Sequence, residues 1–243
     1  PALAYARELV EIAPRTRVEI RAAFEQRWPS LDADTLAMIA HVVLPLVQVT
    51  PRGVWRDNGP AALTTIESWL GGSLSTDRTL DRLVTRYLAA FGPASVADLQ
   101  AWSGLTRLRE VVDRLRDSLR MFRSDDGIEL YDLPDAPRPD RDVEAPPRFL
   151  PEYDNVLLSH KDRSRVIPDG RRVPLPPGNG ASAGTVLVDG RFEATWRLDG
   201  SDLLVESFDA VSTRDAEAIQ VEGRALLRFV AGEPGEVRIS QPD

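Results

Sequence analysis

The first part of the chain contains three short stretches in which apolar residues recur every three or four positions, as they do on one face of a helix. These stretches span residues 2–13, 16–28 and 32–44. The inward face of the third is predicted to carry Leu36, Ile39, Ala40 and Val43. Segments 46–49 and 54–56 then flank a Pro-Arg-Gly turn and predict a β-hairpin. Three short helices followed by a hairpin is the element order of a winged helix-turn-helix.

The same order of elements repeats in the next part of the chain. Helical spacing of apolar residues over 80–91 predicts a first helix, and a capping box of Ser95 and Asp98 predicts the start of a second. A Ser-Gly turn precedes a third helix, and the Asp-Asp-Gly sequence at 125–127 predicts another hairpin. We therefore assign two tandem winged helix-turn-helix units, at residues 1–72 and 73–134.

The period of the pattern changes after residues 135–147, which are rich in proline and charge and are predicted to form an extended linker. Beyond it, segment 148–159 is predicted to be a strand with an interruption. Further strands follow, joined by two Asp-Gly pairs that favour tight turns, and segment 213–230 predicts a final helix. Residues 148–243 are therefore predicted to form a small antiparallel β-barrel-like domain with a C-terminal helix, and the chain belongs to the α+β class.

Composition narrows the possible chemistry. The 243 residues include no cysteine and two histidines, which excludes disulfides, thiolate metal sites, cysteine nucleophiles and multi-histidine metal sites. We accordingly predict neither a metal nor a cofactor. No apolar run approaches the roughly 20 residues that cross a bilayer, and the first residues do not resemble a signal peptide. A cytoplasmic location without membrane contact is expected.

The net charge of −8 and the pI of about 5.0 argue against indiscriminate nucleic-acid binding but leave room for a local basic patch. Helix 32–44 begins with two aspartates and contains no arginine or lysine, so DNA phosphates should repel it. His41, among apolar neighbours, is expected to be a core or boundary residue. The matching helix of the second unit carries Arg107 and Arg109, which either contact DNA or form local ion pairs such as Arg109–Asp113.

The segment 149–167, FLPEYDNVLLSHKDRSRVI, holds the most distinctive polar residues. Asp154 and Asn155 lie in an apolar strand context, where polar side chains need hydrogen-bond partners. A candidate phosphate-binding patch follows, formed by His160, Lys161, Arg163, Arg165, Arg171 and Arg172. The alternative is a mobile basic loop with local salt bridges, because residues 174–184 are rich in proline and glycine. No catalytic motif stands out, and no catalytic residue is assigned.

The resemblance of the chain to a known family rests on four stretches: LPLVQVTPRGVWRDNG, RYLAAFGPASVADLQAWSGL, FLPEYDNVLLSHKDRSRVI and GTVLVDGRFEATWRL. They resemble the winged helix DNA-binding domain-containing proteins of actinobacteria, within the superfamily of AlkZ-like (YcaQ-like) DNA glycosylases. The resemblance implies tandem winged helices around a groove, a small β-barrel that also touches DNA, and damaged or distorted double-stranded DNA as partner. It implies hydrolysis of the N-glycosidic bond of alkylated or crosslinked purines in the glycosylase members, without metal or cofactor. The residues implied near the groove or on DNA are Asp154, Asn155, His160, Lys161, Arg163 and Arg165.

The catalytic signature of those glycosylases is a glutamine, an apolar residue, then glutamine or aspartate, in a winged helix upstream of the region matched here. The Gln48-Val49-Thr50 string fulfils it neither in position nor in residues. We therefore expect either that an upstream segment is missing from this chain or that the protein is a shorter relative that binds without cutting. The alternative function is a non-enzymatic regulator or protein-interaction module, which the acidic total charge favours. The sequence does not indicate the oligomeric state.

Overall fold

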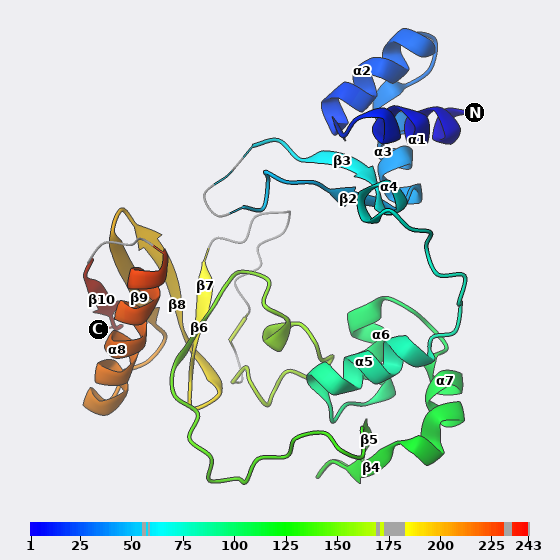
Figure 1. Cartoon of the computed structure of the whole chain (residues 1–243). Helices are drawn as coiled ribbons and strands as arrows, with labels where there is room; N and C mark the ends of the chain where they lie inside the picture. The colour runs from blue at the N-terminus through cyan, green and yellow to red at the C-terminus, as the bar shows by residue number, and fades with distance from the viewer. Residues whose placement is uncertain (55–56, 58, 169–170, 173–182, 231–234, 243) are drawn as a thin grey trace. The chain divides into compact units, whose positions relative to one another are not determined.

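The structure is a computed structural model, which describes residues 1–54, 57, 59–168, 171–172, 183–230 and 235–242. It divides into two compact units, Pro1–Arg78 and Thr79–Asp243 (Figure 1). The predicted linker 135–147 lies inside the second unit and contains neither helix nor strand. Residues 79–134 and 148–243 thus belong to one compact unit.

The first unit combines four helices with a small antiparallel sheet among its described residues. The helices are α1 (Ala2–Ile12), α2 (Arg17–Arg27), α3 (Ala33–Val43) and α4 (Ile66–Leu70). The strands are β1 (Arg15–Thr16), β2 (Leu46–Gln48) and β3 (Ala62–Thr65), in the order β1-β3-β2. The first three helices confirm the predicted pattern, and a Thr16–Glu19 capping box begins α2. Buried residues of α1, α2, α3 and β3 form its core.

Two details of this unit differ from the prediction. Among the described residues, β2 pairs with β3, and Val54 of the predicted partner segment forms an isolated bridge with Arg52. Residues 55–56 lie outside the described residues. The inward face of α3 is also rotated from the predicted one: Ala40 is buried, but Ile39 is 41% and Val43 57% exposed. The apolar run on α3 is wider than the core that it faces, so its pattern did not define one face.

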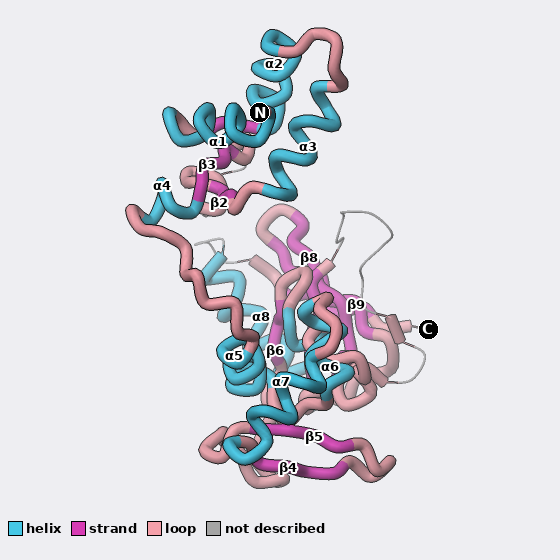
Figure 2. Tube along the Cα trace, turned by 90° about the vertical axis from the view of Figure 1, so that its right-hand side faces the viewer, coloured by secondary structure: helices cyan, strands magenta, loops and turns pink. Residues whose placement is uncertain are grey.

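The second unit begins with three helices and a hairpin. These are α5 (Asp81–Phe91), α6 (Val96–Ser103), α7 (Leu108–Leu115), β4 (Arg120–Arg123) and β5 (Glu129–Asp132). The predicted capping box of Ser95 and Asp98 starts α6, and Gly104 ends it with the left-handed φ of 69°. Figure 2 shows β4 and β5 paired beside the end of α7. Tyr87, Leu99, Leu108 and Tyr131 are at most 1% exposed and lie in the core of this part.

The remaining residues form a five-stranded sheet with one helix. Its elements are β6 (Arg148–Leu150), β7 (Gly184–Val188), β8 (Arg191–Asp199), β9 (Asp202–Ser207), α8 (Thr213–Val230) and β10 (Val237–Ser240). The strand order is β10-β9-β8-β7-β6. The predicted Asp-Gly turn joins β7 to β8 with positive φ at both Asp189 and Gly190.

The predicted antiparallel pairing is confirmed for β6 to β9, but the barrel-like arrangement is wrong for the described strands. The sheet is open, because β6 and β10 form its two edges and do not pair with each other. Strand β10 runs parallel to β9, since the chain returns through α8 before it adds this strand. The buried residues Ile219 and Leu227 of α8 pack into the core of the sheet.

The predicted strand at 148–159 is shorter in the structure. It ends as β6 at Leu150, and the 3₁₀ turn η2 (Asn155–Leu157) follows. The chain from 151 to 168 then leaves the sheet, while Leu157 and Ile167 pack with Phe192 in a separate small core. This excursion brings the basic segment to helices α5 and α6. Of the expected flexible stretch 174–184, residues 174–182 lie outside the described residues.

Candidate functional site

The basic loop, residues 159–165, is attached to the helices of the second unit by side-chain hydrogen bonds. The Tyr87 hydroxyl of α5 donates to the Ser159 carbonyl oxygen at 2.7 Å. Just before the loop, the indole nitrogen of Trp102 in α6 donates to Asn155 Oδ1 at 3.2 Å. Tyr87 is 1% exposed, so its hydroxyl needs a partner, and the loop backbone provides one. These contacts hold the start of the loop against the helices.

Asp98, the third residue of α6, forms the other contact between helix and loop. Its Oδ2 accepts from the Ser95 amide at 2.8 Å and from the Ser95 hydroxyl at 2.7 Å. Its Oδ1 accepts from the Lys161 amide at 2.9 Å and the Asp162 amide at 3.4 Å. Burial raises the pKa of Asp98, but the hydrogen bonds from Ser95 and Lys161 and the charge of His160 outweigh burial and hold the pKa below its usual value. Asp98 is therefore a buried carboxylate anion.

Three cations of the loop are exposed: Lys161, Arg163 and Arg165. The Arg163 Nε donates to the His160 carbonyl oxygen at 3.2 Å, and Arg165 reaches the Pro93 carbonyl oxygen at 3.5 Å. Within the described part of the chain, none of the three forms an ion pair with a carboxylate. Hydrogen bonds from Ser164 lower the pKa of Asp162 in the same loop, and Asp162 is close enough to Arg165 for that charge to lower it further. The three cations nevertheless lie outside ion-pair distance of any described carboxylate, which leaves their hydrogen-bond donors open to an anionic ligand.

The loop borders two neighbouring pockets of the second unit. The larger, of about 770 Å³, lies between the start of α6, the turn joining β4 to β5, and the loop. Arg109, Lys161 and Arg165 line it together with carboxylates of that turn. The smaller, of about 280 Å³, is lined by His160, Arg163 and Arg165. The structure therefore brings five predicted site residues to adjoining surfaces.

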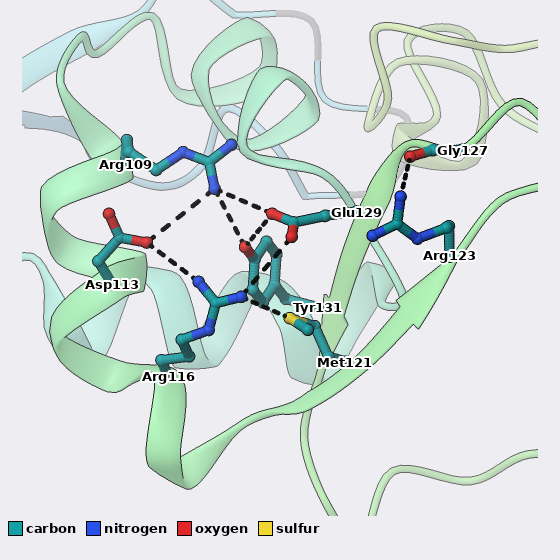
Figure 3. Close-up of polar contacts among 8 residues, drawn as sticks. All are labelled: Arg109, Asp113, Arg116, Met121, Arg123, Gly127, Glu129 and Tyr131. Carbon is teal, nitrogen blue, oxygen red and sulfur yellow. Dashed lines mark hydrogen bonds and ion pairs between the residues drawn. The ribbon is translucent and has the colours of Figure 1, made fainter.

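The arginines of α7 take part in local ion pairs. Arg109 contacts the Tyr131 hydroxyl at 3.0 Å, Glu129 at 3.5 Å and Asp113 at 4.0 Å, as Figure 3 shows. The predicted Arg109–Asp113 pair is thus confirmed. Arg107 pairs with Glu110 at 2.8 Å and is highly exposed. Exposed pairs of this kind contribute about 0–1 kcal/mol, so a phosphate can still compete for either arginine.

Other predicted residues lie apart from the pockets. The Arg171 guanidinium binds Glu193, Asp209 and the Phe192 carbonyl, and its side chain is only 15% exposed. Arg172 is exposed. Asp154 is not in a strand: its Oδ1 caps η2 by accepting from the Val156 amide at 2.8 Å. Neither Asp154 nor Asn155 lines the two pockets. The Asp154 side chain caps a local turn, and the Asn155 side chain accepts a hydrogen bond from Trp102. The prediction of a strand here did not include these contacts.

Comparison with known proteins decides the family. The model of the AlkZ-like DNA glycosylase family matches residues 1–229. The chain belongs to this family. Among solved structures, the Streptomyces sahachiroi DNA glycosylase AlkZ is similar, with a TM-score of 0.68 and 18% sequence identity. The similarity covers 98% of this chain and 68% of that one and, at such identity, establishes the fold. No curated protein sequence matches the chain.

In this AlkZ-like chain, the exposed side of helix α3 is largely apolar. Helix α3 of the first unit contains no arginine or lysine, and Met38 and Val42 are exposed on it. His41 is exposed as well, which corrects the prediction of a core or boundary residue.

No helix in the described ranges is long and apolar enough to cross a membrane. Those ranges also contain no cluster of three or more carboxylate or histidine side chains suited to a metal.

His160 is the titratable side chain of the basic loop that is partly buried. Its Nδ1 lies 2.8 Å from the Ser159 hydroxyl, while its Nε2 is buried without a hydrogen bond to any described residue. Burial and the nearby Arg165 lower the pKa of His160, and Asp98 and the carbonyls of Phe91 and Pro93 only partly offset this effect. The folded protein therefore favours the neutral ring.

This pKa predicts a pH dependence of stability. Because the folded pKa of His160 lies below the unfolded value of about 6.5, the unfolded state binds more protons as the pH falls below that value. Unfolding free energy should then decrease between pH 7 and 5, with a slope of at most about 1.4 kcal/mol per pH unit from this residue. Denaturant titrations should show a shallower decrease for His160→Gln. Equal slopes for wild type and His160→Gln would contradict the assignment.

Proposed function

We propose that this chain binds double-stranded DNA and that Lys161, Arg163 and Arg165 of the basic loop contact its phosphates. One observation carries the proposal. Three exposed cations without carboxylate partners among the described residues lie on a loop fixed to α6, in a chain whose net charge is −8. Phosphate contacts supply most of the affinity of proteins for DNA, and the local field matters more than the total charge.

The proposal extends to the reaction that this binding serves. Membership of the AlkZ-like DNA glycosylase family supports excision of alkylated or crosslinked bases from damaged or distorted duplex, with the loop holding the DNA backbone. The order α5, α6, α7, β4, β5 supports a winged helix-turn-helix in the second unit, with Arg107 and Arg109 on its third helix as additional contacts. His160 and Arg172 remain candidates for weaker contacts. Arg171 is left out, because two carboxylates already neutralise it.

The test is the salt dependence of duplex binding. Wild-type affinity should fall steeply between 50 and 200 mM salt, and Arg163→Ala with Arg165→Ala should reduce the slope of log affinity against log salt by about 1.8, or 0.9 per lost phosphate contact. Fluorescence anisotropy of a labelled duplex measures both quantities. The control is Arg224→Ala with Arg228→Ala on α8, which removes the same charge elsewhere and should keep the wild-type slope. Absence of salt-dependent binding, or an unchanged slope in the loop variant, would contradict the proposal.

A second candidate function concerns the first unit alone. Its helix α3 occupies the place of a third helix that would read DNA, but it begins with acidic residues and exposes Met38, Ile39, Val42 and Val43. A surface of this composition suits contact with protein more than contact with phosphate. We therefore keep a protein-interaction role for α3 as the alternative, alongside DNA binding by the second unit.

A further inference from the structure

Asp98 is a buried carboxylate directly behind the cations that the proposed function assigns to DNA. It is 5% exposed, and it also lines the larger pocket with Lys161 and Arg165. An anion at this position repels phosphate, and the α6 start needs only one of its two oxygens for its capping box. The second oxygen is used on the backbone of the basic loop. Phosphate binding by the cations does not explain why a carboxylate oxygen accepts a hydrogen bond from the loop backbone.

The two oxygens of Asp98 have separate partners. Oδ2 accepts from the amide and hydroxyl of Ser95, and Oδ1 accepts from the amides of Lys161 and Asp162. All these partners donate, so the site requires two acceptors and is matched by an ionised carboxylate. Asparagine offers one acceptor and an amino group. In Asp98→Asn, we expect the remaining oxygen to stay with Ser95, whose two bonds at 2.8 and 2.7 Å are the shorter ones. The loop amides would then face a donor in place of an acceptor.

Asp98 contacts the loop backbone in the middle of the loop, next to the exposed cations. Tyr87 holds the loop at Ser159, before the cations. After the cations, the amides of Val166 and Ile167 donate to the Arg163 carbonyl, and Ile167 enters the small core. Between these two ends, the amides of Lys161 and Asp162 donate to Asp98. Within the part of the chain that the structure describes, these are the hydrogen bonds by which a helix side chain fixes the loop backbone.

We propose that Asp98 is a positioning residue for DNA binding, which orders the backbone of the basic loop before DNA arrives so that Lys161, Arg163 and Arg165 are presented together. The inference rests on the proposed function of the loop. Pre-ordering a binding segment improves affinity because the entropy of ordering is not lost on association. Leaving even one residue's backbone to be ordered by DNA corresponds to about a tenfold loss of affinity.

The sign of the effect separates positioning from charge. Asp98→Asn removes a negative charge beside the phosphate-binding cations, so electrostatics alone would strengthen DNA binding. Positioning predicts the opposite, an affinity about tenfold weaker at every salt concentration. The salt slope should stay at the wild-type value, because all three cations are still present and still meet phosphate in the complex. The matched control is Asp126→Asn, an exposed carboxylate of the β4–β5 turn that lines the same pocket, and its affinity should be equal to or higher than wild type.

Amide hydrogen exchange provides a readout that does not depend on affinity. In the free Asp98→Asn protein, the amides of Lys161 and Asp162 should exchange faster than in wild type, and bound duplex should restore their protection. Ser95→Ala removes the hydroxyl bond to Oδ2 and the bond that the hydroxyl accepts from the Asp98 amide, but it leaves the Oδ1 bonds to the loop in place. It should therefore weaken the start of α6 while exchange at the loop and DNA affinity remain unchanged. If Asp98→Asn does not fold, Asp98→Glu keeps the charge and the capping box while moving the oxygens by one methylene. It should give the same faster exchange and weaker binding.

The outcomes distinguish this inference from the function on which it rests. Wild type without salt-dependent DNA binding would remove the proposed function, whereas exchange would still report whether Asp98 orders the loop. Wild-type DNA binding with equal or tighter binding by Asp98→Asn would overturn the positioning role alone. A reduced salt slope in Asp98→Asn would also overturn it, because cations would then have been lost from the contact. Unchanged exchange at Lys161 and Asp162 would do the same.

Discussion

Replacing Lys161 and Arg165 together by glutamate should lower the affinity for duplex DNA by about 100-fold or more at 0.1 M salt. Both side chains are exposed, line the larger pocket, and lack carboxylate partners among the described residues. Each lost phosphate contact costs about one order of magnitude at this salt concentration, since log affinity changes by about 0.9 per contact and decade of salt. Charge reversal adds repulsion to that loss. Anisotropy titrations of a labelled duplex at several salt concentrations measure the effect.

The control for this prediction carries the same net charge. Arg224→Glu with Arg228→Glu places the reversed charges on the exposed face of α8, away from both pockets. Its affinity should fall by less than tenfold, because screening over a Debye length of about 10 Å limits the effect of distant charges. Equal losses in the two double variants would mean that total charge governs binding. The basic loop would then have no special part in it.

The features that the sequence predicted correctly are those with short-range signals. The capping box at Ser95–Asp98 needs only four consecutive residues, and it begins α6 in the structure. The turn at Asp189-Gly190 likewise depends on the backbone freedom of two adjacent residues. Such patterns determine structure within a single element, so they can be recognised without knowledge of the surrounding fold.

The features that the sequence did not predict depend on distant partners. Strand β3 pairs with β2 and also packs against α1, which lies far from it in the sequence. The parallel pairing of β10 with β9 follows from the return of the chain through α8, which adjacent strand patterns do not encode. The exposed apolar residues of α3 broadened its pattern and hid its true inner face.

The candidate site shows the same division. The cluster of cations at 160–165 was visible as a sequence pattern, and the structure places Lys161 and Arg165 with Arg109 around one pocket. The neutralisation of Arg171 by acidic residues 22 and 38 positions away was not visible. Nor was the second role of Asp98, whose capping box is a sufficient local explanation for an aspartate there. Its contact with the loop spans 63 positions and appears only once the loop is seen to leave the sheet.

Gly184→Ala should destabilise the second unit strongly, although the sequence places this glycine at the end of a stretch expected to be loop. Gly184 is the first residue of β7 and lies opposite Trp196 of β8. A methyl group there would lie 2.6 Å from the Leu150 carbonyl oxygen and closer still to the Trp196 indole. The indole nitrogen donates to that same carbonyl at 2.9 Å, linking β8 to β6 across β7. The added carbon would therefore displace the indole, break this bond and separate β6 from β7.

Overpacking costs about 1–3 kcal/mol and the loss of the hydrogen bond adds about 1 kcal/mol, so we expect a destabilisation of roughly 2–4 kcal/mol. Tm should fall by roughly 5–15 °C, since 1 kcal/mol corresponds to about 2–4 °C in a domain of this size. Thermal unfolding followed by circular dichroism measures the shift. Gly72→Ala is the control, because nothing lies within 4 Å of its added carbon and its φ lies outside the left-handed region. A wild-type Tm for Gly184→Ala would mean that the indole does not occupy this place against β7, and the pairing of β6 with β7 would have to be reconsidered.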